Sequence, residues 1–303
     1  MRKIIFNIIV QIIVIALIFY NYKELITKEI VTVFFDLKVF YILIYLSIPK
    51  ILIIFSFNYI LSILSNKKLQ SIRIGEIILT GGLINHILPG AGFIYKYAKL
   101  KKINHITIPQ YAVAQSLWSL KSLSAYAIFA IIGGTILITI GKNTIYILLT
   151  LCFLLIIIIK FRSKIIKYLS FLSINFKFIS NLVETLSILH KNIINLLKIY
   201  IVFVFLVLIE SYGFFLVLDY FSDESLDIIK TSYVFIMSSL TTIFLAVNYF
   251  GVFAAVSSVS SNLIMPEATN IFIYAFLFNI LNIISMILVI SILTLLIIIK
   301  KPK

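Results

Sequence analysis

Four lysines lie close together at Lys96, Lys99, Lys101 and Lys102, and no acid lies between positions 95 and 109. A lysine ammonium is a strong point charge for a phosphate group. Basic clusters beside membrane helices also attract anionic lipid headgroups. The cluster is therefore a candidate binding site for a lipid phosphate. The rule that basic loops stay in the cytoplasm explains it equally well.

Three further charges interrupt long apolar runs, at Lys50, Lys121 and Glu210. A charge at the centre of a membrane helix costs roughly 2.5–3.5 kcal/mol on insertion scales, so such residues face a cavity or a partner. We predict that Lys121 and Glu210 pair inside a helix bundle. The alternative is that the charges have a structural role only or extend to the membrane surface. Lys50 follows Pro49, which marks a candidate kink.

Polar side chains also share one face of the helix expected after Gln110. They are Gln115, Ser119, Ser122 and Tyr126, which recur at helical spacing, and Trp118 lies beside them. Such a face can be the wall of a polar cavity. It can equally serve hydrogen bonds between helices, which need no substrate.

The stretch HILPGAGFIYKYAKLKK, residues 86–102, interrupts an apolar run with Pro89, Gly90 and Gly92. Proline has no backbone N–H, and glycine accepts conformations that other residues avoid. A broken helix within a membrane is tolerated only where protein buries it or where it lines a wet cavity. We predict a re-entrant segment that turns back toward the cytoplasm. The alternative is a kinked helix that crosses.

Asn85 and His86 stand just before this break. They either contact a substrate or satisfy backbone groups that the break leaves free, and we favour the second role. A weaker counterpart is NYFGVFAAVSSVSS, residues 248–261, which makes Asn248 and Gly251 candidates for a second break.

The composition indicates an integral membrane protein. Of the 303 residues 62% are hydrophobic and 12% are charged, and the mean hydropathy is +1.16. Several apolar runs reach the roughly 20 residues that span a bilayer. The net charge of +15 lies in short loops, so topology explains it before nucleic acid does. The apolar segments are roughly 4–20, 39–62, 77–94, 110–140, 144–159, 199–218, 231–264 and 269–299.

The charges of the loops predict how these segments cross. Loop 95–109 and region 160–198 are basic, whereas loop 219–230 is acidic. If every segment crossed, basic loops would lie outside and the acidic loop inside, against the positive-inside rule. The rule is satisfied if 77–94 re-enters from the cytoplasm and 231–264 re-enters from outside.

We therefore expect an all-α polytopic helical bundle that forms a single membrane domain over residues 1–303. Its two inverted repeats would cover about 1–141 and 142–303, each with a re-entrant broken helix, an arrangement that underlies many transporters. Region 160–198 alternates lysines with apolar clusters, which predicts a cytoplasmic amphipathic region. Both termini would face the cytoplasm of a bacterial or archaeal cell.

No catalytic chemistry is visible in the sequence. There is no nucleophile triad, no phosphate-cradling glycine loop and no paired-carboxylate site. The single Cys152 forms no internal disulfide, and no Cys/His cluster has metal-binding spacing. We expect a protein that is not an enzyme, uses no cofactor or metal and binds no nucleic acid.

The segment LPGAGFIYK, residues 88–96, resembles the Leu-Pro-Gly-x-Gly-Glu-x-x-Arg motif of the transmembrane region of lysylphosphatidylglycerol synthases, a flippase-like membrane family. Phe93 and Lys96 stand where that motif has its acid and its arginine. The family's second glycine turn survives only as FGV at 250–252. A mechanism that depends on the family's carboxylates therefore does not carry over.

The resemblance implies a flippase-like protein that binds or translocates an anionic lipid or a lipid-linked envelope precursor. The chain stops at Lys303 without the soluble synthase domain, so we expect the lipid-handling part alone. Its partners would be an anionic membrane lipid and an envelope-biosynthesis enzyme. One alternative is a non-transporting accessory or scaffold protein of an envelope glycan or lipid synthesis complex, and another is a small-solute carrier.

Overall fold

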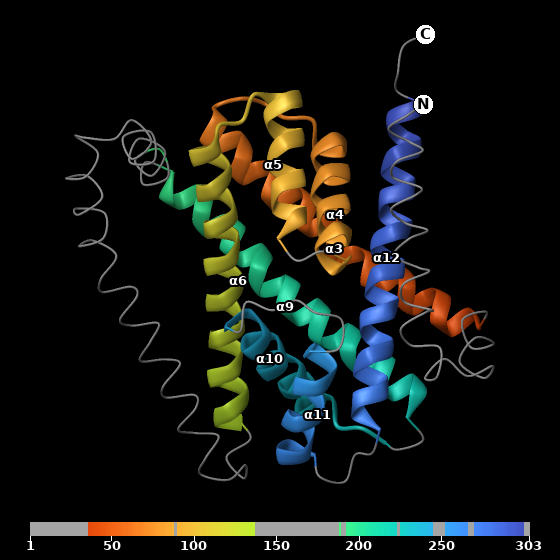
Figure 1. Ribbon diagram of the computed structural model, residues 1–303. Coiled ribbons are helices and arrows are strands. Elements are labelled where there is room, and N and C mark those ends of the chain that lie inside the picture. Colours follow the sequence, from red (N-terminus) through yellow and green to blue (C-terminus); the bar gives the residue numbers. More distant parts are fainter. Residues whose placement is uncertain are drawn as a thin grey trace.

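The computed structural model describes residues 36–87, 90–136, 188, 192–222, 225–244, 252–265 and 270–299. Within these ranges the chain is helical and has no strand (Figure 1). The segments predicted at 4–20 and 144–159, and most of region 160–198, lie outside the described residues. The helices are α3 (Leu37–Ser65), α4 (Ser71–Ile87), α5 (Ala91–Asn104), α6 (Ile108–Ile136), α9 (Ile193–Phe221), α10 (Ile228–Phe244), α11 (Val252–Ile264) and α12 (Ile271–Ile299).

Four of the described helices are long and apolar enough to cross a membrane, namely α3, α6, α9 and α12. This confirms the prediction of a helical membrane protein. The helix lengths also recur along the chain. Helices α3 to α6 have 29, 17, 14 and 29 residues, and α9 to α12 have 29, 17, 13 and 29.

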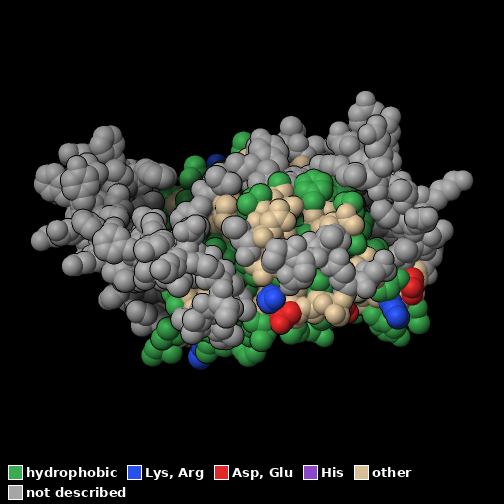
Figure 2. Space-filling view, turned by 90° about the horizontal axis from the view of Figure 1, so that it is seen from below, with side chains coloured by type: hydrophobic (Ala, Val, Ile, Leu, Met, Phe, Trp, Pro, Cys, Tyr) green, Lys and Arg blue, Asp and Glu red, His purple; other side chains and the backbone are tan. Residues whose placement is uncertain are grey.

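The long helices keep large apolar side chains on the surface, where water would penalise them. Phe55 is 58% exposed on α3, Phe205 is 56% exposed on α9, and Leu295 is 57% exposed on α12. The described surface seen from below carries few charged side chains among apolar ones (Figure 2). Exposed apolar surface of this extent suits contact with lipid.

Two segments expected as loops are largely helical. The region 63–76 contains the start of α4, and the region 95–109 contains most of α5. Glu76, which falls between the expected segments 39–62 and 77–94, is only 3% exposed within α4. The four lysines that follow the break likewise lie on α5 rather than in a loop.

Helices α4 and α5 form a tight hairpin. Gly90 takes φ +83°, a left-handed conformation that glycine adopts without strain, and α5 begins at the next residue. A Cβ atom at Gly92 would collide with the carbonyl oxygen of Gly81 on α4. Asn85 accepts a hydrogen bond from the backbone N–H of Gly92 at 2.8 Å, so Asn85 satisfies a backbone group at the start of α5. Pro89 lies outside the described residues.

The two ends of this hairpin lie together. The Gln110 side-chain amide donates to the carbonyl of Leu64 at 3.1 Å, which joins the start of α6 to the end of α3. The chain therefore enters α4 and leaves α5 at one end of the molecule. The start of α10 likewise lies beside the end of α11, because the Thr231 hydroxyl contacts the Met265 sulfur at 3.7 Å. The α4–α5 pair lies in the upper half of Figure 1 and the α10–α11 pair in the lower half.

The start of α3 adjoins the end of α9. The Tyr220 hydroxyl donates to the Asp36 carboxylate at 2.5 Å. This hydrogen bond, with that from the Lys38 backbone N–H, holds the pKa of Asp36 below its ordinary value. Asp36 also caps α3 through the same Lys38 N–H. The contact brings Asp36 to the end of the molecule where the acidic loop 219–230 begins.

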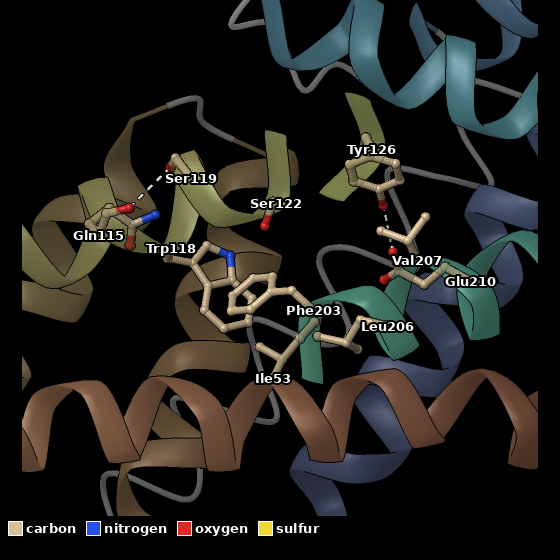
Figure 3. A pocket seen from close by; sticks show the side chains of 10 residues that line it. All are labelled: Ile53, Gln115, Trp118, Ser119, Ser122, Tyr126, Phe203, Leu206, Val207 and Glu210. Carbon is tan, nitrogen blue, oxygen red and sulfur yellow. Dashed lines mark hydrogen bonds between the residues drawn. The ribbon is translucent and has the colours of Figure 1, made fainter. Parts of the chain in front are cut away.

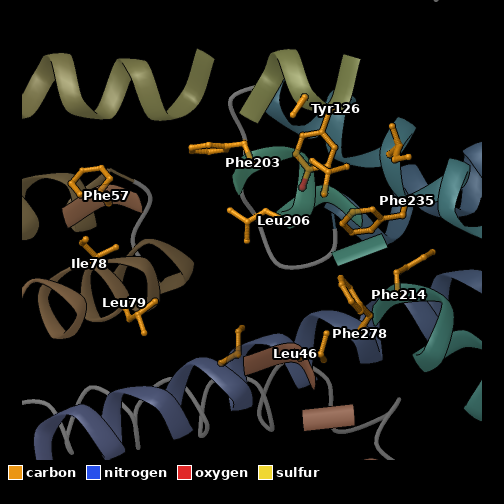
Figure 4. Packing of buried hydrophobic residues seen from close by; sticks show 14 of the residues in the cluster. Leu46, Phe57, Ile78, Leu79, Tyr126, Phe203, Leu206, Phe214, Phe235 and Phe278 are labelled. Carbon is orange, nitrogen blue, oxygen red and sulfur yellow. The ribbon is translucent and has the colours of Figure 1, made fainter. Parts of the chain in front are cut away.

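An aromatic cluster fixes the second group of helices. Phe214 of α9, Phe235 of α10, Phe253 of α11 and Phe278 of α12 pack with ring centroids 5.1–6.0 Å apart. Figure 4 shows Phe214, Phe235 and Phe278 of this cluster. Several of these pairs are edge-to-face, the geometry that the ring quadrupole favours. The cluster therefore joins the α10–α11 pair to α9 and α12.

Candidate functional site

A cavity of about 320 Å³ lies between α3, α6 and α9 (Figure 3). One wall is polar and comes mainly from α6. The opposite wall comes from α3 and α9 and is apolar except for Glu210 of α9. The lining residues are Ile53, Gln115, Trp118, Ser119, Ser122, Tyr126, Phe203, Leu206, Val207 and Glu210.

The polar wall is the face that the sequence predicts. Gln115, Ser119, Ser122 and Tyr126 all line the cavity, with Trp118 beside them. Helical spacing is enough to place them together, because residues three and four apart lie on one face of a helix. The sequence could not show which neighbours close the cavity. The packing of α6 against α3 and α9 supplies them.

Glu210 brings a carboxylate into this cavity. The buried Tyr126 hydroxyl donates to one of its oxygens at 2.7 Å (Figure 3). A hydrogen bond to a charged acceptor is among the stronger ones in proteins. Lys121 is not among the lining residues, and its ion pair with Glu210 stays a prediction.

Lys50 is more deeply buried than Lys121 and Glu210, with 7% of its surface exposed. Its ammonium donates to the side-chain oxygen of Asn282 on α12 at 3.0 Å. Lys50 also interacts electrostatically with Glu210. The sequence analysis predicted no partner for Lys50 and did not identify Asn282. The signal for Asn282 was an amide within α12, the most apolar of the four spanning helices.

The hairpin residues His86 and Lys96 lie near this charge. The Lys96 side chain lies across Gly81, where a Cβ atom would overlap it. His86 is within electrostatic reach of both Lys96 and Lys50. His86 of α4 thus lies within the fields of one lysine of α3 and one lysine of α5.

The remaining lysines of α5 have different surroundings. The Lys99 ammonium lies 5.7 Å from the ring centre of Tyr95, and that of Lys101 lies 6.0 Å from the ring centre of Tyr97. These distances suit cation–π contacts. Lys102 is exposed in the last turn. Of the four lysines, Lys96 is thus the one whose side chain is shown packed across Gly81 of α4.

The other candidates divide into two groups. Gly90 and Gly92 shape the hairpin turn, and Asn248 and Gly251 lie outside the described residues. In the part of the chain that the structure describes, no cluster of His, Cys, Asp and Glu could hold a metal ion. The arrangement can hold a polar group against Glu210 and an anion against the lysines.

Comparison with protein-family models, with curated proteins and with solved structures finds no match to this chain.

Proposed function

We propose that this chain is a flippase-like membrane protein that binds an anionic lipid or a lipid-linked envelope precursor and carries it across the membrane. The observation that carries the proposal is the cavity between three helices of membrane-spanning length. Its volume lies within the range of small-molecule sites. A polar wall suits a headgroup, and the apolar wall with Phe203 and Leu206 suits the first part of an acyl or prenyl chain.

We also propose that the helices form two inverted repeats with re-entrant hairpins. The recurring lengths of α3–α6 and α9–α12 support this arrangement. So do the contacts that bring together the two ends of each hairpin. A hairpin that starts and ends at one end of the molecule returns to the membrane face from which it came. Transporters of this kind hold substrate between such repeats.

The topology makes a prediction for cysteine labelling. In a Cys152→Ser background, single cysteines at the exposed positions Gln70 and Lys101 should react only from the cytoplasmic side. A cysteine at the exposed Ser225 should react only from outside, because α9 separates it from the basic loops. The measurement is labelling of intact cells with a membrane-impermeant maleimide. Reaction of positions 70 and 101 from opposite sides would make the α4–α5 hairpin a true crossing.

A lipid-scrambling assay tests the function. The purified chain in vesicles with fluorescent phosphatidylglycerol should speed the bleaching of inner-leaflet label by an added reductant. Ser122→Trp should remove most of this gain, because the indole fills the cavity. Leu120→Trp is the matched control, since Leu120 is 49% exposed on the same helix.

The outcome of this assay separates the candidate functions. A wild-type rate equal to that of protein-free vesicles would overturn transport by the isolated chain. Co-purification with a glycosyltransferase and no transport would support the accessory role instead. Equal rates for the two tryptophan variants would show that lipid does not pass through this cavity.

A further inference from the structure

Lys96 is a half-buried cation on α5. It lies one turn into α5, and its aliphatic part packs across Gly81 of α4. Among the described residues, no carboxylate interacts with its ammonium and no hydrogen bond to it is formed. A buried ammonium without a partner is costly, because it has lost the water that solvated its charge.

A second cation lies nearby on α3. This cation is Lys50, and the close packing of α4 on α12 places it near His86. At Gly82 of α4 a Cβ atom would lie only 3.3 Å from the Met286 sulfur of α12. His86 is one turn beyond Gly82, and Asn282 is one turn from Met286. Asn282 holds the Lys50 ammonium at 3.0 Å. This packing brings His86 beside Lys50, and Lys50 and Lys96 both act electrostatically on His86.

Among the residues that the structure describes, the charges of this cluster do not balance. Lys50 has Glu210 as its nearby carboxylate, and Lys96 has none among the described residues. These two ammonium groups and one carboxylate give this set of described residues a net positive charge. A bound anion would neutralise it, and the imidazole of His86 supplies a further N–H donor. A phosphate group matches this need, because its several oxygens accept hydrogen bonds from more than one donor at once.

We infer that Lys50, His86 and Lys96 form an oxyanion site beside the α4–α5 hairpin, and that it takes the phosphate group of a lipid. The inference deepens the proposed function and rests on it. It assigns phosphate capture to residues of three different helices. The exposed Lys101 and Lys102, which the sequence analysis also named as phosphate-binding candidates, would then only keep this end of the hairpin on the cytoplasmic side.

The test is equilibrium binding to the purified full chain in detergent. The probes are dioleoyl phosphatidic acid, dioleoylglycerol as the same lipid without phosphate, and inorganic phosphate. Wild type should bind phosphatidic acid and not dioleoylglycerol. Lys96→Met should weaken binding about ten- to a hundredfold, the usual loss for one hydrogen bond between charged groups. The matched control Lys101→Gln with Lys102→Gln should bind as wild type does.

Thermal melting distinguishes a lost site from a lost fold. Without ligand, Lys96→Met should melt at the same temperature as wild type or higher, because the variant removes an uncompensated buried charge. Only the wild type and the control should gain melting temperature when phosphatidic acid is added. If Lys96→Met does not fold, His86→Gln takes its place, with weaker binding expected for the same reason.

The outcomes separate the site from the function. Equal affinity of wild type, Lys96→Met and His86→Gln for phosphatidic acid would overturn the site even if the vesicles show transport. If Lys96→Met removes the affinity for phosphatidic acid and the wild-type vesicles show no transport, the site is upheld and the flippase proposal is overturned. Binding of inorganic phosphate as tight as that of phosphatidic acid would overturn the lipid as the source of the phosphate.

Discussion

Gly92→Leu is expected to prevent the α4–α5 hairpin from closing. The new side chain would meet the carbonyl oxygen of Gly81 and the side chain of Asn85. Backbone atoms of a packed helix cannot move aside as a flexible side chain does. We expect a loss of about 3 kcal/mol or more in the free energy of unfolding, at the upper end of the cost of overpacking.

The measurement is unfolding of the purified protein in detergent, followed by circular dichroism. Ala98→Leu is the matched control, because it adds the same side chain at an exposed position of the same helix. A Gly92→Leu variant as stable as Ala98→Leu would mean that the two helices do not approach as closely as the structure shows.

The second large effect concerns Lys50 and Glu210. Lys50→Met should destabilise the protein by about 3–5 kcal/mol, because it leaves the Glu210 carboxylate without its nearby cation and Asn282 without its donor. Glu210→Gln should also destabilise, since Tyr126 then donates to a neutral amide. The double variant should lose clearly less than the sum of the two single losses, by about 0.5–3 kcal/mol.

A parallel cycle with Lys121→Met and Glu210→Gln tests the pair that the sequence suggested. Unfolding in detergent gives the four free energies that each cycle needs, for the wild type, the two single variants and the double variant. If the losses for Lys50 and Glu210 are additive and those for Lys121 and Glu210 are strongly coupled, Lys121 and not Lys50 is the partner of Glu210. Coupling in the first cycle alone would make Lys50 the partner of Glu210.

Much of the helical framework follows from the sequence because apolar runs of this length leave no other solution in a bilayer. The segments expected at 39–62, 110–140, 199–218 and 269–299 correspond to α3, α6, α9 and α12. Helical periodicity likewise placed Gln115, Ser119 and Ser122 on one cavity wall. These inferences are local, since each depends on residues close together in the chain.

The hairpins were only partly predictable. Proline and glycine indicated a break near position 90, yet the lysines after it suggested a loop where α5 continues to Asn104. Charge alone does not separate a basic loop from the polar end of a helix. The reason Gly92 is required also lies outside local sequence, because the obstacle is a carbonyl on another helix.

By itself the sequence determined that this chain is a helical membrane protein, where its long helices lie and which residues share the polar face of α6. Only the tertiary structure decided that Tyr126 is hydrogen-bonded to Glu210, that Lys50 is held by Asn282, and that the Lys96 side chain packs across Gly81. The physical reason is the range of the interactions. Hydrophobic length and helical periodicity act within one segment, whereas the partner of a buried charge comes from whichever helix packs against it, here across as many as 232 positions.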